Sequence, residues 1–221
     1  MAADKNRINA PNIILCEGND ARYFMINYLA YLCKNDDFYE QFDVIDFGGV
    51  TELPRRLKVL LKMPGFDTVQ SILVIRDAET SCSDAKREIA KAFTSVGFQT
   101  PQRPGGISEI HGIKVSYLLF PSLDSNGEEN GTLEDLCLKL CDVEDKERIV
   151  EDINQFLCTQ AELHKFQYPR IHKNRIHMLF SLHDKYVGSK IGEAGKIGLY
   201  DWDSELLDYL KSTMRNIAQD D

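Results

Sequence analysis

The sequence predicts an α/β fold, in which an open, mostly parallel β-sheet has helices on both faces and is followed by a helical C-terminal extension. Short continuous apolar runs alternate with stretches of helical periodicity as far as Phe120. This alternation favours parallel strands joined by right-handed helical crossovers. From Thr132 onward the periodicity is helical. A chain of 221 residues is long enough for one large domain with a helical appendage.

Two strand and helix units are predicted first. Residues 11–17 form an apolar run that ends in an acid and a glycine, and residues 21–33 then repeat apolar side chains near helical spacing. A second apolar run, residues 42–47, stops at a pair of glycines. Thr51 is the expected N-cap of the helix that follows over residues 53–63.

A third and a fourth strand follow. Residues 71–77 are apolar and end in acidic residues, and Ser83 is expected to cap a helix that continues toward Val96. The fourth run, residues 113–120, closes at a proline. Between this helix and the fourth strand, residues 99–112 are rich in turn residues and predict a surface loop.

Helices dominate the second half of the chain. Apolar positions recur at helical spacing in residues 133–141, 145–166 and 171–183. A glycine-punctuated stretch, residues 188–204, separates them from a final helix over residues 204–218. The sequence therefore predicts that this half packs as helices rather than extending the sheet.

Composition and charge limit the functional classes. The chain has 26 Lys and Arg against 35 Asp and Glu, a formal net charge of −9 at pH 7. This is the wrong sign for binding nucleic acid by bulk charge, so a phosphate-rich partner needs a local basic surface or bound cations. No apolar run approaches the roughly 20 residues of a membrane span, and the polar start lacks a signal-peptide core. We expect a cytoplasmic protein with no membrane partner and with reduced cysteines.

Acidic residues follow the first and third strands. Glu17 ends the first apolar run, with Asp20 three residues on, and Asp77 and Glu79 end the third. If these strands are neighbours, as in a flavodoxin-like order, the four carboxylates converge at the carboxyl edge of the sheet. Clustered carboxylates in a crevice repel each other unless protons or cations neutralise them. Oxygen ligands without nearby Cys or His favour Mg²⁺ or Mn²⁺, whereas helix capping explains each acid singly.

A second acidic group follows the fourth strand. Asp124 lies in a segment rich in Ser, Asn and Gly, and Glu134 and Asp135 begin a predicted helix. These three are secondary candidates for metal ligands. Helix capping and a solvated loop explain them equally well.

Several segments taken together resemble a known family. They are EGNDARYF, DAE, FPSLDSNGEENGTLEDL, and HKNRIHMLF with the later GLYDWDS. In order and spacing they are similar to small Toprim-like proteins related to the nuclease domain of the overcoming-lysogenization-defect enzymes. The similarity runs from about Asn12 to the last helix.

The resemblance implies a Toprim-type sheet and metal-dependent phosphodiester chemistry. Glu17 would be the glutamate of the catalytic motif, and Asp77 and Glu79 would occupy the positions of a D-x-D pair. The chain departs from the family at two points. Glu79 replaces the second aspartate, and the turn before Gly131 is longer than the compact P-D-N form, which leaves open whether Asp124 takes the place of that acid.

Basic residues complete the expected site. Lys173 in HKNRIHMLF matches a lysine of the family's stretch, which would stabilise charge on the pentacoordinate phosphate. Arg175 and His177 accompany it. An exposed helix face explains Lys173 and Arg175 equally well. We expect His177, among apolar neighbours, to lie in or near the core rather than to act as a general base.

The sequence thus supports two functional hypotheses. The first is a Mg²⁺- or Mn²⁺-dependent nuclease that acts on DNA or RNA, with Glu17 and Lys173 as catalytic residues. The second is a non-catalytic Toprim-like binding or assembly module that works beside a separate ATPase. In either case we expect residues 1–141 to form the Toprim-like α/β core and residues 142–221 to form a helical extension packed on it as one compact unit.

Overall fold

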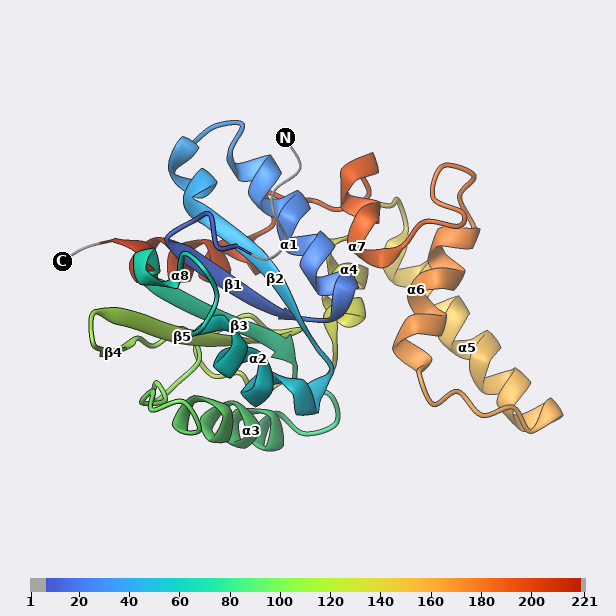
Figure 1. Cartoon of the computed structure of the whole chain (residues 1–221). Coiled ribbons are helices and arrows are strands. Elements are labelled where there is room, and N and C mark those ends of the chain that lie inside the picture. The colour runs from blue at the N-terminus through green and yellow to red at the C-terminus, as the bar shows by residue number, and fades with distance from the viewer. Residues whose placement is uncertain (1–6, 220–221) are drawn as a thin grey trace.

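The computed structural model describes residues 7–219 and contains a five-stranded sheet of order β2-β1-β3-β5-β4 (Figure 1). The pairs β1–β2, β1–β3 and β3–β5 are parallel, and β4 is an antiparallel edge strand beside β5. The predicted α/β fold with an open, mostly parallel sheet is therefore confirmed. The strands are β1 (Asn12–Glu17), β2 (Phe42–Gly48), β3 (Ser71–Asp77), β4 (Ser108–Ile110) and β5 (Ile113–Phe120).

Helices cover both faces of the sheet. Helices α2 and α3 pack on one face, and the other face is covered by α1, α4 and α8 with further C-terminal segments. The helices are α1 (Gly18–Leu32), α2 (Leu53–Leu60), α3 (Cys82–Thr94), α4 (Leu133–Leu140), α5 (Lys146–His164), α6 (Ile171–Ser181), α7 (Ile191–Ala194) and α8 (Asp208–Ala218). Short 3-10 helices are η1 (Asp37–Gln41), η2 (Val50–Glu52), η3 (Phe66–Thr68), η4 (Gly195–Ile197) and η5 (Glu205–Leu207).

The strand sequences follow from this two-sided burial. In β1, Ile13 and Leu15 point to the face covered by α2 and α3, whereas Ile14 and Cys16 point to the opposite face. All four side chains are fully buried. Because neither face of the central strands meets water, the sequence shows a continuous apolar run instead of alternating polar and apolar residues.

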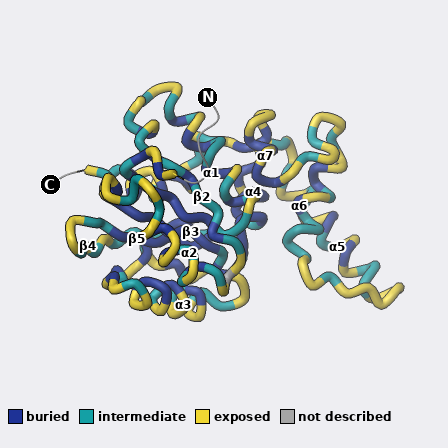
Figure 2. Tube along the Cα trace, viewed as in Figure 1, coloured by how far each residue is buried: buried dark blue, intermediate teal, exposed yellow. Residues whose placement is uncertain are grey.

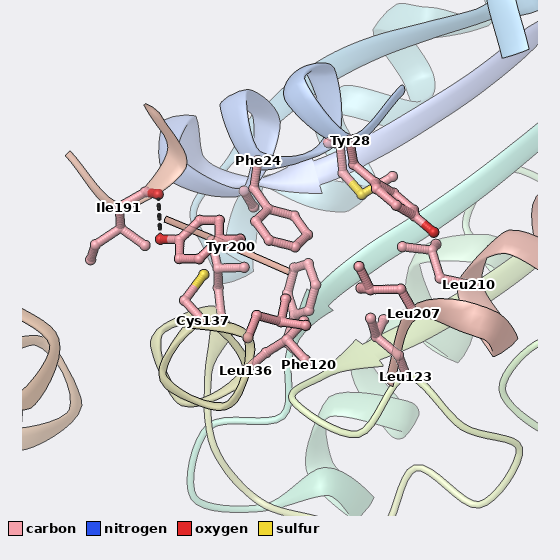
Figure 3. Close-up of a cluster of buried hydrophobic side chains, with 14 of the residues drawn as sticks. Phe24, Tyr28, Phe120, Leu123, Leu136, Cys137, Ile191, Tyr200, Leu207 and Leu210 are labelled. Atoms are coloured by element: carbon pink, nitrogen blue, oxygen red, sulfur yellow. Dashed lines mark hydrogen bonds between the residues drawn. The ribbon is translucent and has the colours of Figure 1, made fainter. Parts of the chain in front are cut away.

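The larger core joins the sheet to the C-terminal half. Figure 3 shows Phe24 of α1 against Phe120 of β5, with ring centroids 6.0 Å apart. The buried Tyr200 hydroxyl donates a 2.7 Å hydrogen bond to the Ile191 carbonyl, which fixes α7 on this core. Met214 of α8 belongs to the same buried cluster. The C-terminal segments therefore share a core with the sheet, while the boundary at residue 141 stays a prediction.

Three local predictions differ from the structure. Ser81, not Ser83, caps α3, because Ser81 has an extended backbone and its side chain accepts the Asp84 N–H. Thr51 lies inside η2, two residues before α2 begins. The predicted loop contains β4, which turns into β5 through two residues with positive φ, His111 and Gly112. Such a two-residue turn suits an antiparallel hairpin.

Helices α5 and α6 form a hairpin that projects from the body of the molecule (Figure 1). Of the residues in α5, Ile153 and Leu157 are buried, and the end of the hairpin is exposed (Figure 2). No helix between residues 7 and 219 is long and apolar enough to cross a membrane. Residues 1–6, part of the polar start considered above, lie outside the described residues.

Candidate functional site

Strands β1 and β3 are adjacent and parallel, which is the arrangement that the predicted carboxylate cluster required. In their shared register Cys16 lies opposite Ile75. Glu17 and Asp77 are the last residues of these strands, so both end at the same edge of the sheet. This is the edge at which open parallel sheets bind their ligands.

The turn from β1 into α1 is fixed by an acid of the neighbouring strand. Gly18 adopts a positive φ of 82°, which glycine accepts without strain. Its N–H donates a 2.9 Å hydrogen bond to Asp46 Oδ1, and the same oxygen accepts the Gly48 N–H at 2.7 Å. Asp46 therefore holds the backbone immediately after Glu17.

Five of the predicted site residues line one cavity of about 200 Å³, which we call the carboxylate cavity. They are Glu17 of β1, Asp20 of α1, Asp77 of β3, Glu134 of α4 and Lys173 of α6. Segments from both halves of the sequence thus meet at the end of the sheet. The structure brings together four of the seven predicted ligands and the predicted lysine.

Glu79 and Asp135 face a different cavity. This neighbouring cavity of about 660 Å³ lies beside α4, α5 and α6. Glu79 is exposed and adopts a positive φ of 54°, and its backbone forms two 2.8 Å hydrogen bonds with Gly131. Asp135 Oδ2 accepts the Thr132 N–H at 2.9 Å at the start of α4, which is the capping role weighed above.

Asp124 does not line the carboxylate cavity either. Its Oδ1 accepts the backbone N–H groups of Asn126 and Gly127, each at 2.7 Å. A carboxylate that accepts two backbone donors two and three residues ahead closes a local turn. The structure therefore gives Asp124 a place within its own loop, away from Glu17 and Asp77.

Glu17 is the least satisfied acid of the carboxylate cavity. Its side chain is 12% exposed, and burial raises its pKa to about 7 although the nearby Arg76 lowers it. Arg76 Nε lies 3.4 Å from Glu17 Oε2, but its N–H donates to the Asp77 carbonyl instead. Oε2 is buried and has no hydrogen-bond donor among the described residues. Proximity to Arg76 therefore balances the negative charge of Glu17 only in part, and no hydrogen bond reaches Oε2.

Asp77 also resists ionisation. Burial and then the charges of Glu134 and Glu17 raise the pKa of Asp77 well above its usual value. The Leu133 N–H donates a 2.8 Å hydrogen bond to Asp77 Oδ1, which acts in the opposite direction but does not compensate. The two strand-end carboxyls therefore share a region of excess negative charge.

Glu134 and Lys173 form an ion pair on the cavity wall, in which only the glutamate is buried. Lys173 Nζ lies 3.0 Å from Glu134 Oε1, and the Glu134 side chain is 5% exposed. Burial favours neutral Glu134, yet hydrogen bonds with Thr132 and Lys173 together lower its pKa. Burial likewise opposes the charge of Lys173, and the interaction with Glu134 raises its pKa overall. Both partners are therefore ionised at neutral pH.

Asp20 is positioned by the C-terminal half. Its Oδ1 accepts the Gly192 N–H at 3.4 Å, where α7 packs against α1. A Cβ at Gly192 would clash with the Asp20 carbonyl, so only glycine allows this approach. The glycine-rich stretch therefore serves close helix packing beside the cavity.

Arg76 is a site residue that the sequence reasoning missed. It is 3% exposed and bridges Glu17 to Glu88 of α3, with a 2.9 Å contact from Nη1 to Glu88 Oε2. An arginine inside the apolar run SILVIRD was the available signal, since a buried charge requires partners. Asp46 in β2 was a similar signal.

Arg175 and His177, which were expected to accompany Lys173, do not line the carboxylate cavity with it. Arg175 Nε donates a 2.7 Å hydrogen bond to Asn154 Oδ1, and Arg175 lines the neighbouring cavity. His177 is exposed, so the expectation of a core or partly buried histidine is wrong. Helix α6 turns Ile176 and Phe180 toward the core, and His177 follows Ile176 by 100° around the helix.

The ionisable side chains of the carboxylate cavity that could bind a cation are all carboxylates. Between residues 7 and 219 no three Asp, Glu, His or Cys side chains are grouped closely enough to hold a metal ion as they stand. Mg²⁺ commonly uses one or two carboxylates and keeps several waters. Glu17 and Asp77 supply such a pair, and the buried Glu17 Oε2 lacks a donor. Carboxylate oxygens are ligands of the type that Mg²⁺ and Mn²⁺ prefer.

Fold and site together define an α/β protein with a carboxylate cavity at the carboxyl edge of a parallel sheet. Residues 11–219 match the family described as "Protein of unknown function (DUF3226)", and the chain belongs to this family. No curated protein and no solved structure matches the chain.

Proposed function

We propose that this chain is a Toprim-type phosphodiester hydrolase of the cytoplasm that uses Mg²⁺ or Mn²⁺ to cleave nucleic acid. The observation that supports it is the convergence of Glu17, Asp20, Asp77 and Glu134 with Lys173 around one cavity. The cavity lies where parallel sheets place their chemistry. The resemblance to Toprim-like nuclease domains assigns the same chemistry to Glu17 and Asp77.

The electrostatics of the cavity favour a cation. Burial and mutual repulsion raise the pKa of both Glu17 and Asp77. A divalent ion would relieve this repulsion, with Glu17 and Asp77 as its protein ligands. When bound, such an ion polarises a phosphoryl oxygen and provides hydroxide at neutral pH.

Lys173 supplies a fixed positive charge beside these carboxyls. Its ion pair with Glu134 holds the ammonium group at the cavity wall, and its side chain is 41% exposed. From there it can contact a phosphate oxygen and stabilise the charge that develops as the phosphate becomes pentacoordinate. Arg76 acts through Glu17 instead, because it is buried beneath that carboxylate. Lys173 is thus the proposed catalytic cation, and Arg76 is a positioning residue.

Calorimetric titration of Mn²⁺ tests the cation site. Wild type should show saturable binding, and Asp77→Ala should show none, since it removes one of two proposed ligands. Asp124→Ala is the matched control, because Asp124 is an acid that closes a loop outside the cavity. It should bind Mn²⁺ as wild type does. If neither wild type nor Asp77→Ala shows a binding signal for Mn²⁺, the proposed metal site is wrong.

Cleavage assays test the reaction. Single-stranded and nicked substrates incubated with Mn²⁺ should be cut by wild type and left intact by Asp77→Asn. Cutting that survives Asp77→Asn would assign the activity to another site or to a contaminant.

A non-catalytic Toprim-like module beside a separate ATPase is the second candidate. The ion pairs Arg76–Glu17 and Lys173–Glu134 favour it, because they neutralise part of the cavity without any metal. Saturable Mn²⁺ binding without cleavage of any substrate would support this module over the hydrolase.

A further inference from the structure

One segment of this acidic protein contains no acid. From Leu163 to His183 there is no Asp or Glu, although the chain as a whole has a net charge of −9. The segment contains four of the five histidines of the protein and four cations, Lys165, Arg170, Lys173 and Arg175. It comprises the end of α5, the loop to α6 and all of α6. This stretch therefore has an excess of positive charge in a chain whose net charge is negative.

Aromatic rings lie among these cations at the end of the hairpin. The His164 and Phe166 ring centroids are 5.5 Å apart, and those of Phe166 and Tyr168 are 6.5 Å apart. Phe166 is 55% exposed, and Lys165 beside it is exposed as well. A large aromatic side chain left in water next to cations has an uncovered π-face available for a ligand.

The basic segment leads to the carboxylate cavity. Arg170 is close enough to Lys173 for its charge to act against the protonation of that lysine. Lys173 lines the carboxylate cavity, and His172 and Arg175 line the neighbouring cavity. A polyanion lying along the loop from Phe166 to Arg170 would therefore lead to Lys173, the proposed catalytic lysine. Along this path it would meet no acidic residue of the segment 163–183.

We propose that the exposed loop between α5 and α6, with His164, Lys165, Phe166, Tyr168 and Arg170, binds single-stranded nucleic acid and directs it to the carboxylate cavity. Cations along a path contact successive phosphates, and exposed rings stack with bases whatever their identity. Bases in a duplex are stacked on each other and cannot reach Phe166. The loop would thus bind single strands in preference to duplex. This inference rests on the proposed hydrolase function and specifies the substrate class of that hydrolase.

Fluorescence anisotropy with labelled 12-nucleotide single strands and a 12-base-pair duplex, in EDTA, measures binding without cleavage. Single strands should bind more tightly than the duplex. Phe166→Ala should weaken single-strand binding on the order of tenfold, the usual loss of one stacked base. Phe156→Ala is the matched control, because Phe156 is a phenylalanine of similar exposure, 51%, on the acidic part of α5. It should bind as wild type does.

The salt dependence separates phosphate contacts from stacking. Lys165→Gln combined with Arg170→Gln should reduce the slope of log K against log [salt] by about 1.4, since each phosphate contact to a single strand contributes about 0.7. Lys58→Gln combined with Lys62→Gln removes the same charge near α2, on the opposite face of the sheet, and should leave the slope unchanged.

Four outcomes of the binding experiments would overturn the inference. They are equal binding of duplex and single strand, equal loss in Phe166→Ala and Phe156→Ala, binding of anionic vesicles in place of oligonucleotide, and a Phe166-dependent dimer in light scattering without oligonucleotide binding. Failure of the proposed function has a different result, namely Phe166-dependent single-strand binding in EDTA but no cleavage with Mn²⁺. Cleavage of single strands that Phe166→Ala leaves unchanged would instead overturn the binding surface alone.

Discussion

The acids of the carboxylate cavity differ from those of the following loop in how their oxygens are satisfied. Asp124 and Asp135 accept backbone N–H groups at 2.7 to 2.9 Å within their own turns. Glu17 has a buried oxygen without any donor among the described residues, and Asp77 accepts a single backbone N–H while three other carboxylates raise its pKa. The first pair stabilises the fold, whereas the second pair is costly to keep ionised.

This difference indicates which acids a cation would serve. Glu17 and Asp135 cannot be distinguished by their positions in the sequence, because each lies at or near the start of a helix. Their hydrogen bonds separate them, since a capped carboxylate already has the donors that a metal would replace.

Removal of Arg76 should have the largest effect on stability. Arg76→Met leaves Glu17 buried without its neighbouring positive charge, which we expect to lower the free energy of unfolding by about 3 to 5 kcal/mol. Urea unfolding at pH 7.5 measures this. The double variant Arg76→Met with Glu17→Gln should recover part of the loss, because no uncompensated charge remains. No recovery would show that Arg76 acts through packing alone.

The pH dependence of stability should depend on Glu17. Burial raises its folded pKa from 4.5 to about 7, so the folded state retains a proton that the unfolded state has released between these values. Stability that is present below pH 4.5 is therefore lost as the pH rises through 7, by about 3 kcal/mol. Glu17→Gln should reduce this decline in urea unfolding at pH 5 and pH 8, and Asp77, whose pKa burial also raises, accounts for the rest. Asp124→Asn should retain the whole decline.

Added Mn²⁺ gives a check on the same group. At pH 8 the ion should restore stability to wild type, because it replaces the proton as the neutralising charge. Glu17→Gln should gain less. Equal gains in the two proteins would place the ion elsewhere.

Loss of Lys173 should affect rate more than metal affinity. Lys173→Met removes a charge that acts on the transition state, so turnover should fall on the order of 10²-fold, while Mn²⁺ binding by calorimetry stays close to wild type. Lys185→Met is the control, because Lys185 is an exposed lysine that lines neither of the two cavities. A loss of Mn²⁺ binding in Lys173→Met would assign the lysine a structural role through Glu134.

The smallest effect is expected for the capped acids. Asp135→Ala removes the side chain that accepts the Thr132 N–H, which should lower the free energy of unfolding by about 1 kcal/mol. Mn²⁺ binding should not change. An Asp135→Ala variant that loses Mn²⁺ binding but keeps its stability would reverse the assignment of the two groups of acids.

Most of the fold could be predicted from local sequence. The predicted runs 71–77 and 113–120 coincide with β3 and β5, because a strand buried on both faces needs a continuous apolar stretch and ends where polar residues begin. Strand β4 was not predicted, since its three residues lie in a segment whose composition is typical of a loop. They form a strand because they pair with β5 alone. The cap of α3 was placed two residues late because two serines compete for it.

The candidate site was predictable in part. Glu17, Asp20 and Asp77 follow from strand ends and from one assumption about strand order. The buried Arg76 was not found, because its role depends on Glu88, a partner twelve residues on that helix α3 turns toward it. The apolar sequence neighbours of His177 predict a core or partly buried position, whereas one residue along a helix is enough to change from the buried to the exposed face.

The four long strands, most of the helices and the acids that end the strands could be predicted from the sequence, since these features depend on residues close together in the chain. Which acids meet depends on the packing of distant segments. The packing of helices α4 and α6 places Glu134 and Lys173 in the same cavity as Asp77. Glu79, which has a positive φ, lines the neighbouring cavity instead. Contacts between distant segments depend on how whole elements pack, and local propensity contains no information about that packing.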